Sequence, residues 1–339
     1  MEDTISSDAL SEGSPKSSGP IEKRKIPYRV KINTPVILKT EAFKSETINA
    51  QIVNISEDGL GLSLNSEVEV PSPLSIELEL MDLLLRLQGE VRWGKVFDDG
   101  KYYCGMRFLQ KDEHQDSVLK GFLCTNDEYI QQLINNLPAA EKEASKKIEA
   151  FFKVDVKEFV ENLIALEEAI KEKSMPEAAI FEKLTNISDR IVKKGDELEG
   201  QVKRGMLTKK IKELFRFLTG HWVYKSKMME MAFKKPRGYP GDYKLIEIIY
   251  NNQPISKNFG FYYDRYFHNY PYTIAVKRRM EKMTELLKST IKKIDLPSID
   301  ILNLGSGSCR EMNELFDNPE IKGLKKKSDL PVWTSIRRH

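Results

Sequence analysis

Residues 47–70 have the sequence TINAQIVNISEDGLGLSLNSEVEV. Apolar and polar residues alternate along both halves of this stretch, and Asp58-Gly59 separates the halves. Alternation with a period of two is typical of half-buried strands, and Asp-Gly is a common turn pair. The stretch therefore predicts two strands joined by a turn.

Similar segments lie on both sides of this stretch. They read VKINTPVILKT at residues 30–40, LSIELELMDLLLRLQGEVRW at 74–93 and KYYCGMRFL at 101–109. Pro71-Ser72-Pro73 and Asp98-Asp99-Gly100 separate them, at intervals that favour an all-β barrel over alternating strands and helices. We expect a six-stranded antiparallel β-barrel within residues 21–125.

The overall composition restricts the class of protein. The chain has 339 residues, enough for two or three domains, and a formal net charge of only +3 from 54 basic and 51 acidic residues. This balance does not demand a nucleic acid polymer or an anionic membrane as partner. Cys104, Cys124 and Cys309 are odd in number and far apart, which argues against a disulfide framework. With no apolar run near the ~20 residues of a transmembrane segment, we expect a cytoplasmic protein.

The chain divides further by its local composition. Residues 1–20 are rich in Ser, Gly, Asp and Glu, so we expect a disordered tail. From about Asp127 the sequence becomes rich in Glu and Lys, with apolar residues every three to four positions. That spacing is typical of packed helices and predicts a helical region over residues 126–235.

Residues 236–339 show a different order of elements. A short helix is predicted at 243–250 and a basic helix at 273–294. The apolar run Ser298–Leu304 then leads through Gly305-Ser306-Gly307 into a helix that starts near Arg310. Strand, glycine turn and helix open a nucleotide-binding α/β fold. The chain is therefore predicted to be a multidomain α+β protein with an incomplete Rossmann-like segment at its end.

Two short pieces of the barrel segment suggest a function. Residues 23–29 form the basic run KRKIPYR, and Asn54-Ile55-Ser56-Glu57-Asp58-Gly59 follows the second predicted strand. Together they resemble the PilZ family, whose pattern is R-x-x-x-R followed by [D/N]-x-S-x-x-G. The sequences GEVRW (89–93) and CGMRF (104–108) resemble the late strands of that family.

The resemblance implies that the barrel binds the second messenger cyclic di-GMP. The residues that it places in the site are Arg24, Lys25, Arg29, Asn54, Ser56 and Gly59. The ligand offers two phosphates and guanine edges with N7 and O6 acceptors, and the planar fork of arginine matches both through paired hydrogen bonds. The small Gly59 would let the backbone pass close to the base, and it is equally a plain turn requirement.

This sequence departs from the family pattern at one position. Four residues before Arg29 stands Lys25, and Arg24 lies one place further out. Lysine keeps the charge but lacks the bidentate fork, so either Arg24 takes the role or Lys25 does so with weaker affinity. A basic run before a strand is also often only a solvated segment.

The glycine turn near the C-terminus resembles the first motif of class I S-adenosylmethionine-dependent methyltransferases. Combined with KPRGYPGD at residues 235–242, it is similar to a bacterial family implicated in making hydroxy fatty acid methyl esters. The resemblance implies S-adenosylmethionine binding at Gly305, Ser306 and Gly307. Only residues 305–339 remain after the strand, too few to complete the sheet, so we expect catalysis to be absent.

The aromatic side chains between these motifs have two interpretations. They are Phe259, Phe261, Tyr262, Tyr263, Tyr266, Phe267, Tyr270 and Tyr272. They could cover a lipid-like substrate, or they could be ordinary core residues, which we favour for any one of them.

Three hypotheses of function therefore stand side by side. The chain could be a cyclic di-GMP receptor, a methyltransferase controlled by a PilZ domain, or a scaffold whose helical region recruits a protein partner. The four histidines are far apart in sequence, so no metal site is expected, and the catalytic residues of an enzyme stay unknown.

Overall fold

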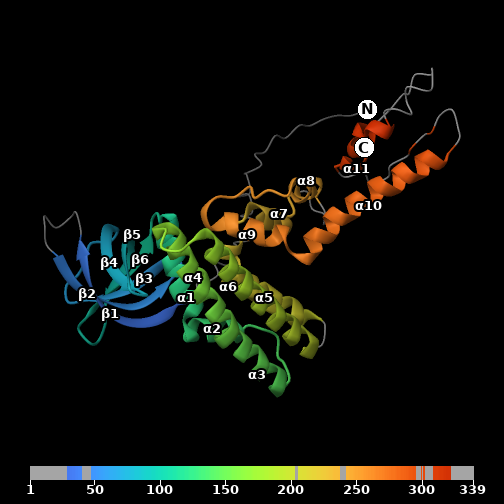
Figure 1. Cartoon of the computed structure of the whole chain (residues 1–339). Coiled ribbons are helices and arrows are strands. Elements are labelled where there is room, and N and C mark those ends of the chain that lie inside the picture. The colour runs from blue at the N-terminus through green and yellow to red at the C-terminus, as the bar shows by residue number, and fades with distance from the viewer. Residues whose placement is uncertain are drawn as a thin grey trace, which may run out of the picture.

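The computed structural model describes residues 29–39, 47–202, 205–236, 242–294, 299, 301 and 308–321. The predicted tail at residues 1–20 lies outside the described residues. A β-barrel occupies one end of the molecule, helices occupy the middle, and a long helix leads away from them at the other end (Figure 1).

Six antiparallel strands form the barrel. They are β1 (Val30–Lys39), β2 (Thr47–Ser56), β3 (Gly59–Leu64), β4 (Ser72–Leu80), β5 (Leu83–Val96) and β6 (Tyr102–Phe108). The strand order is β1-β2-β3-β6-β5-β4, and β1 pairs with β4 to close the barrel. Closure leaves no unpaired sheet edge. The predicted six-stranded antiparallel barrel is confirmed.

Alternating residues of the strands fill the barrel interior. On β4, Leu74, Ile76, Leu78 and Leu80 are buried, while the residues between them are more exposed. Strand β3 differs because all six of its residues are buried. One reason is that the side chain of Asn54 on β2 lies over Gly61 of β3 on the outside of the barrel.

The helices follow the barrel in chain order. They are α1 (Glu113–Thr125), α2 (Asp127–Ile134), α3 (Lys142–Ala150), the π-helix η1 (Phe151–Val156), α4 (Lys157–Glu172), α5 (Glu177–Gln201), α6 (Met206–Val223), α7 (Lys227–Lys234), α8 (Tyr243–Asn251), α9 (Asn258–His268), α10 (Pro271–Lys293) and α11 (Arg310–Asp317). The helical character predicted after Asp127 is confirmed.

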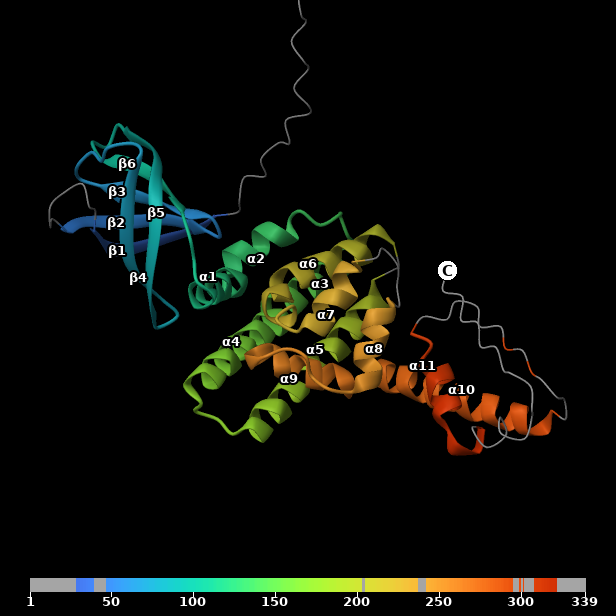
Figure 2. The ribbon, with the colours of Figure 1, turned by 90° about the horizontal axis from the view of Figure 1, so that it is seen from above.

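Helix α1 joins the barrel to the other helices (Figure 2). Asp112 and Gln115 form a capping box at its start, and the side-chain amide of Gln115 also donates to the carbonyl of Arg86 on β5 at 2.6 Å. Further along, Gly121 lets α4 approach so closely that a Cβ here would lie 2.6 Å from Ile164. Most buried apolar residues of the barrel and of the helices belong to one continuous hydrophobic cluster.

The regular elements that the structure describes in the C-terminal part are all helices. Of the predicted strand 298–304, only Ile299 and Ile301 are described, and neither is in a strand. The Rossmann-like segment therefore stays a prediction, although the helix expected near Arg310 is present as α11. Helix α11 packs on α10, where Met312 and Leu315 form a small separate core with Leu287.

Part of the aromatic stretch belongs to the protein core. Phe259, Tyr263 and Tyr266 of α9 are buried in the main hydrophobic cluster, with Phe267 and Tyr270 packed against it. The core interpretation is confirmed for these residues. Tyr272, at the start of α10, is exposed instead.

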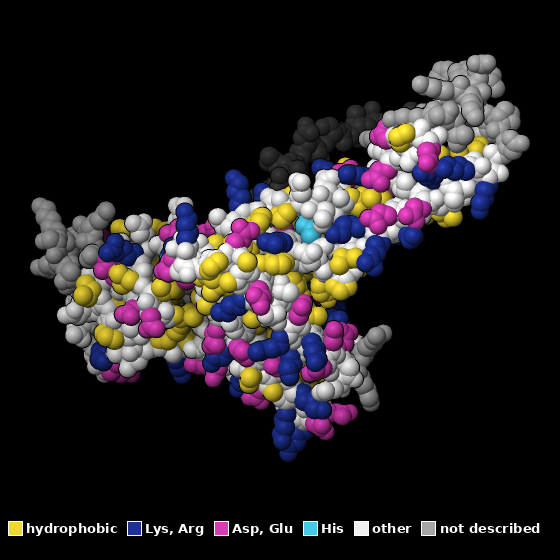
Figure 3. Space-filling view, viewed as in Figure 1, with side chains coloured by type: hydrophobic (Ala, Val, Ile, Leu, Met, Phe, Trp, Pro, Cys, Tyr) yellow, Lys and Arg dark blue, Asp and Glu magenta, His cyan; other side chains and the backbone are white. Residues whose placement is uncertain are grey.

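The outer surface carries both signs of charge. On the face seen in Figure 3, basic and acidic side chains are interspersed over the helices, in agreement with the small net charge. Within the described part of the chain, no helix is both long enough and apolar enough to cross a membrane.

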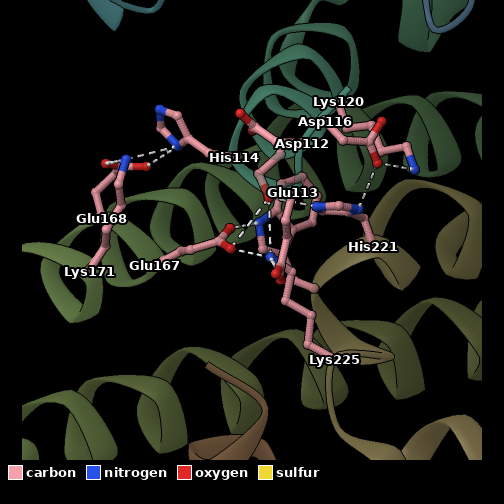
Figure 4. Close-up of polar contacts among 12 residues, drawn as sticks. Asp112, Glu113, His114, Asp116, Lys120, Glu167, Glu168, Lys171, His221 and Lys225 are labelled. Carbon is pink, nitrogen blue, oxygen red and sulfur yellow. Dashed lines mark hydrogen bonds and ion pairs between the residues drawn. The ribbon is translucent and has the colours of Figure 1, made fainter. Parts of the chain in front are cut away.

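A polar network holds α1, α4 and α6 together beside the barrel (Figure 4). On α1, Ser117 Oγ lies 2.7 Å from His221 Nε2 and 3.3 Å from the carboxylate of Glu167 on α4. Lys225, in the turn after α6, forms an ion pair with Glu167 and donates to Ser117 Oγ, and the indole of Trp222 on α6 donates to Glu167 at 3.0 Å. Burying several charges together is tolerable because each has hydrogen-bonding partners.

His221 is the titratable group of this network most affected by its surroundings. Burial, with the nearby positive charges of Lys225 and Lys120, lowers its pKa to about 3, although Asp116 opposes the shift with Nδ1···Oδ2 at 3.5 Å. The folded protein therefore holds this imidazole neutral, while the unfolded chain protonates it near its ordinary pKa.

This difference predicts a loss of stability in mild acid. The contribution of neutral His221 is complete above the unfolded pKa of about 6.5 and is lost progressively as the pH falls towards 3. Between pH 7 and pH 5 we expect the parent to lose about 1–2 kcal/mol more unfolding free energy than His221→Gln. Urea unfolding at both pH values measures this, and equal losses in the two proteins would contradict it.

Candidate functional site

Two of the predicted site residues, Arg29 and Asn54, lie together where β1 begins and β2 ends. Arg29 directly precedes β1, and the pairing of Lys31 with Asn54 brings the start of β1 beside the end of β2. The guanidinium Nη1 of Arg29 donates a hydrogen bond of 2.9 Å to Oδ1 of Asn54. Two motifs that are 25 residues apart in sequence are thus joined in space.

Ser56 and Gly59 hold the turn between β2 and β3. Ser56 is only 1% exposed, and its hydroxyl donates to the carbonyl of Gly59 at 3.0 Å. A Cβ at Gly59 would lie 2.2 Å from the backbone oxygen of Met106 on β6. Both residues therefore have a structural role in the turn, whatever they contact in a complex.

Four residues form a row across the outside of the barrel. The strand register pairs Asn54 of β2 with Gly61 of β3, Gly61 with Gly105 of β6, and Gly105 with Trp93 of β5. A Cβ at Gly61 would lie 2.8 Å from Asn54 Nδ2, and a Cβ at Gly105 would lie 2.1 Å from Trp93 Nε1. The two glycines therefore allow the amide and the indole to lie against the strands. We call these four residues the glycine row.

A hollow of about 520 Å³ lies over three members of this row, Asn54, Gly61 and Trp93. Its lining consists of Val53, Asn54, Gly61, Leu62, Trp93, Phe97, Asp98, Asp99, Tyr103 and Cys104. Its volume is in the range of about 300–1,000 Å³ that is usual for small-molecule sites. We call it the outer hollow.

Aromatic side chains form one wall of the outer hollow. Trp93 is 45% exposed and Phe97 48%, and the Phe97 and Tyr103 rings meet edge to face at 5.1 Å. Asp99 accepts hydrogen bonds from the backbone N–H of Lys101 and from the Tyr103 hydroxyl, and these two bonds lower the pKa of its carboxyl. Such a wall can stack against a flat, aromatic ligand group.

Cys104 adds no reactive group to the hollow. Burial raises the pKa of its thiol to about 11, so it is protonated near neutral pH. The protonated thiol is a poor nucleophile.

Several predicted site residues cannot be placed. Arg24 and Lys25, the alternative partners of Arg29, lie outside the described residues, as do Gly305, Ser306 and Gly307 of the predicted S-adenosylmethionine site. Among the described residues, no group of three or more His, Cys, Asp and Glu side chains is arranged to hold a metal ion.

Residues that the sequence analysis did not assign to the site also contact it. The sequence pattern assigns Trp93 to a strand and gives it no role in the site. A glycine in one strand and a tryptophan in a paired strand are the available signal, because the indole can lie over the glycine, as Trp93 does over Gly105. Lys111, Tyr129 and Gln132, which lie beyond the barrel strands, contact the turn or the backbone of Arg29. No local sequence pattern indicates those three contacts.

Within the polar network of Figure 4, Ser117, His221 and Asp116 are connected in the same order as the serine, histidine and aspartate of a catalytic triad. A nucleophile must be reachable by its substrate, but Ser117 is only 4% exposed. Its hydroxyl oxygen also accepts a hydrogen bond from Lys225 at 3.1 Å. We therefore interpret this network as structural.

Comparison with known proteins agrees with this geometry. The family model described as PilZ domain matches residues 22–123, so the N-terminal domain is a PilZ domain, a class whose role is that of a cyclic di-GMP receptor. No curated protein matches the chain. The comparisons give no support to the methyltransferase resemblance.

Two solved structures are similar to part of the chain. The Bacillus subtilis inhibitor of motility (MotI/DgrA) is 15% identical over 34% of this chain and 53% of its own, with a TM-score of 0.27. The PilZ domain of CeSA from a cellulose-synthesizing bacterium is 16% identical over 27% of this chain and 90% of its own, with a TM-score of 0.23. The chain thus spans about half the length of the first of these proteins.

The turn geometry predicts that Gly59 cannot be replaced without damage to the fold. In Gly59→Ala the added methyl group meets backbone atoms of β6 that cannot move independently, so we expect a loss of at least about 2 kcal/mol in unfolding free energy. The matched control is Gly195→Ala in α5, where a Cβ meets no atom within 4 Å and helix propensity should add about 0.5–1 kcal/mol. Thermal unfolding compares the two, and similar melting temperatures would contradict the prediction.

Proposed function

We propose that this chain is a cyclic di-GMP receptor that binds the nucleotide in the outer hollow of its PilZ domain. The observation that carries the proposal is the glycine row, which places Asn54, and with it Arg29, at one end of the hollow and Trp93 at the other. A cyclic dinucleotide has phosphates, which a cation such as Arg29 can bind, and bases, on which an aromatic ring such as Trp93 can stack.

Each residue has a role in this proposal. Arg29 exchanges its hydrogen bond with Asn54 for contacts to a phosphate or to guanine O6 and N7, and Asn54 then bonds the ligand. Arg24 or Lys25 supplies the second cation. Trp93 stacks on a guanine, because every base has a face that an aromatic ring can cover. Ser56 and Gly59 fix the turn on which Asn54 depends.

Titration calorimetry with cyclic di-GMP tests the proposal. We expect the parent to bind with micromolar or tighter affinity and Arg29→Ala to lose binding, because no other described side chain of the site replaces its fork. Arg86→Ala is the matched control, since Arg86 is an exposed barrel arginine paired with Glu77 on β4. An absence of binding by the parent would reject the proposal and favour the scaffold hypothesis.

The role of Trp93 is tested separately. If a guanine stacks on the indole, Trp93→Ala should weaken cyclic di-GMP binding by about 5- to 150-fold, which corresponds to the usual 1–3 kcal/mol per stacked base. Tyr272→Ala, which removes an exposed aromatic ring from α10, should leave the affinity unchanged. Unchanged affinity in Trp93→Ala would remove the indole from the site.

The proposal also includes output through the helices and a cytoplasmic location. Exposed apolar side chains such as Phe217 on α6 and Phe233 on α7 support a protein partner for the helical region. The three cysteines are free, which agrees with a reducing compartment.

A further inference from the structure

The short helix α2 contacts both halves of the proposed nucleotide site. The side-chain Nε2 of Gln132 donates to the backbone carbonyl of Arg29 at 3.2 Å. One helical turn away, the hydroxyl of Tyr129 donates to the carboxylate of Glu57 at 3.3 Å. Because Glu57 lies in the turn between Ser56 and Gly59, α2 holds the arginine and the turn in one arrangement.

Lys111 adds a second contact to the same turn. Its ammonium group donates to the backbone carbonyl of Glu57 at 2.7 Å and forms an ion pair with Asp116 of α1 at 2.9 Å. Asp116 in turn lies beside His221 of the polar network. The turn is therefore attached to α1 as well as to α2.

The adjoining side of α2 packs on the helical region. Ile130 and Leu133 are buried, and α2 packs against α3 and η1. Asp127, the first residue of α2, forms an ion pair of 2.8 Å with Lys157, the first residue of α4. A movement of α2 thus acts directly on the segment between α3 and α4.

That segment is the π-helix η1. Residues Ala150, Phe151, Val156 and Lys157 keep right-handed helical angles, so α3, η1 and α4 form one continuous helix. A π-helical turn differs from an α-helical turn by one residue in hydrogen-bond register, and such turns occur frequently at functional sites. Phe151 of η1 also packs on Phe215 of α6, so a change of register here reaches a further helix.

We propose that Tyr129 and Gln132 of α2 are positioning residues for the nucleotide site, and that occupancy of the site is transmitted through α2 to η1. The inference rests on the proposed function. When Arg29 leaves Asn54 to bind the ligand, the carbonyl held by Gln132 and the turn held by Tyr129 shift with it. Coupling is reciprocal, so the contacts that transmit binding also set the affinity.

Hydrogen exchange of the full chain, with and without saturating cyclic di-GMP, tests the inference. In the parent, nucleotide should change amide exchange in residues 127–134 and 151–156 as well as in the barrel. Gln132→Ala should bind about fivefold or more weakly, and at saturation it should lose the response at 151–156. The matched control Gln131→Ala, whose amide bonds only to Asn135 among the described contacts, should respond as the parent does.

A second arm needs no ligand. In the free chain, Tyr129→Phe should speed exchange in the peptide that spans the turn 56–59, because its hydroxyl bonds Glu57. Gln132→Ala should speed exchange in the peptide that spans the start of β1, because its amide bonds the carbonyl of Arg29. Gln131→Ala should change neither. If the parent binds nucleotide but residues 127–156 show no change, the inference is wrong and the proposed function stands. If the parent does not bind, the proposed function fails. Unchanged exchange of the turn in Tyr129→Phe and of the start of β1 in Gln132→Ala would then overturn the positioning role as well.

Discussion

The glycine row is the constraint on which the proposed site depends. Its four members come from β2, β3, β6 and β5, and the register of these neighbouring strands places them side by side. Side chains at Gly61 or Gly105 would displace Asn54 or Trp93, so the shape of the outer hollow follows directly from the absence of two Cβ atoms. Arg29 enters the arrangement through its hydrogen bond to Asn54.

The barrel and the helices share a hydrophobic core and two sets of polar contacts. Lys111, Tyr129 and Gln132 hold the turn and the start of β1, and the network around Ser117 and Glu167 holds α1 to α4 and α6. A sensor domain that is connected to its neighbour only by a flexible linker can bind a ligand without changing the rest of the chain. Here the contacts that hold the proposed site also reach the helices.

Much of this fold could be predicted because its signals are local. Alternation of apolar residues and the Asp58-Gly59 turn predict the strands, and the three-to-four-residue spacing predicts the helices. Asn54, Ser56 and Gly59 stand together in sequence, so their motif is visible there. The place of Trp93 depends on strand pairing across the barrel, which no local pattern records. The contacts of α2 and the π-helix η1 depend on tertiary packing and were not predictable either. Arg24, Lys25 and the predicted S-adenosylmethionine residues stay predictions, because they lie outside the described residues.

A crystal structure of the chain with bound cyclic di-GMP would test the account most directly. It should show a guanine against the indole of Trp93 and a phosphate or guanine edge on Arg29, with the nucleotide lying over Gly61 and Gly105. A nucleotide bound elsewhere on the protein, with the hydrogen bond between Arg29 and Asn54 still intact, would contradict the account.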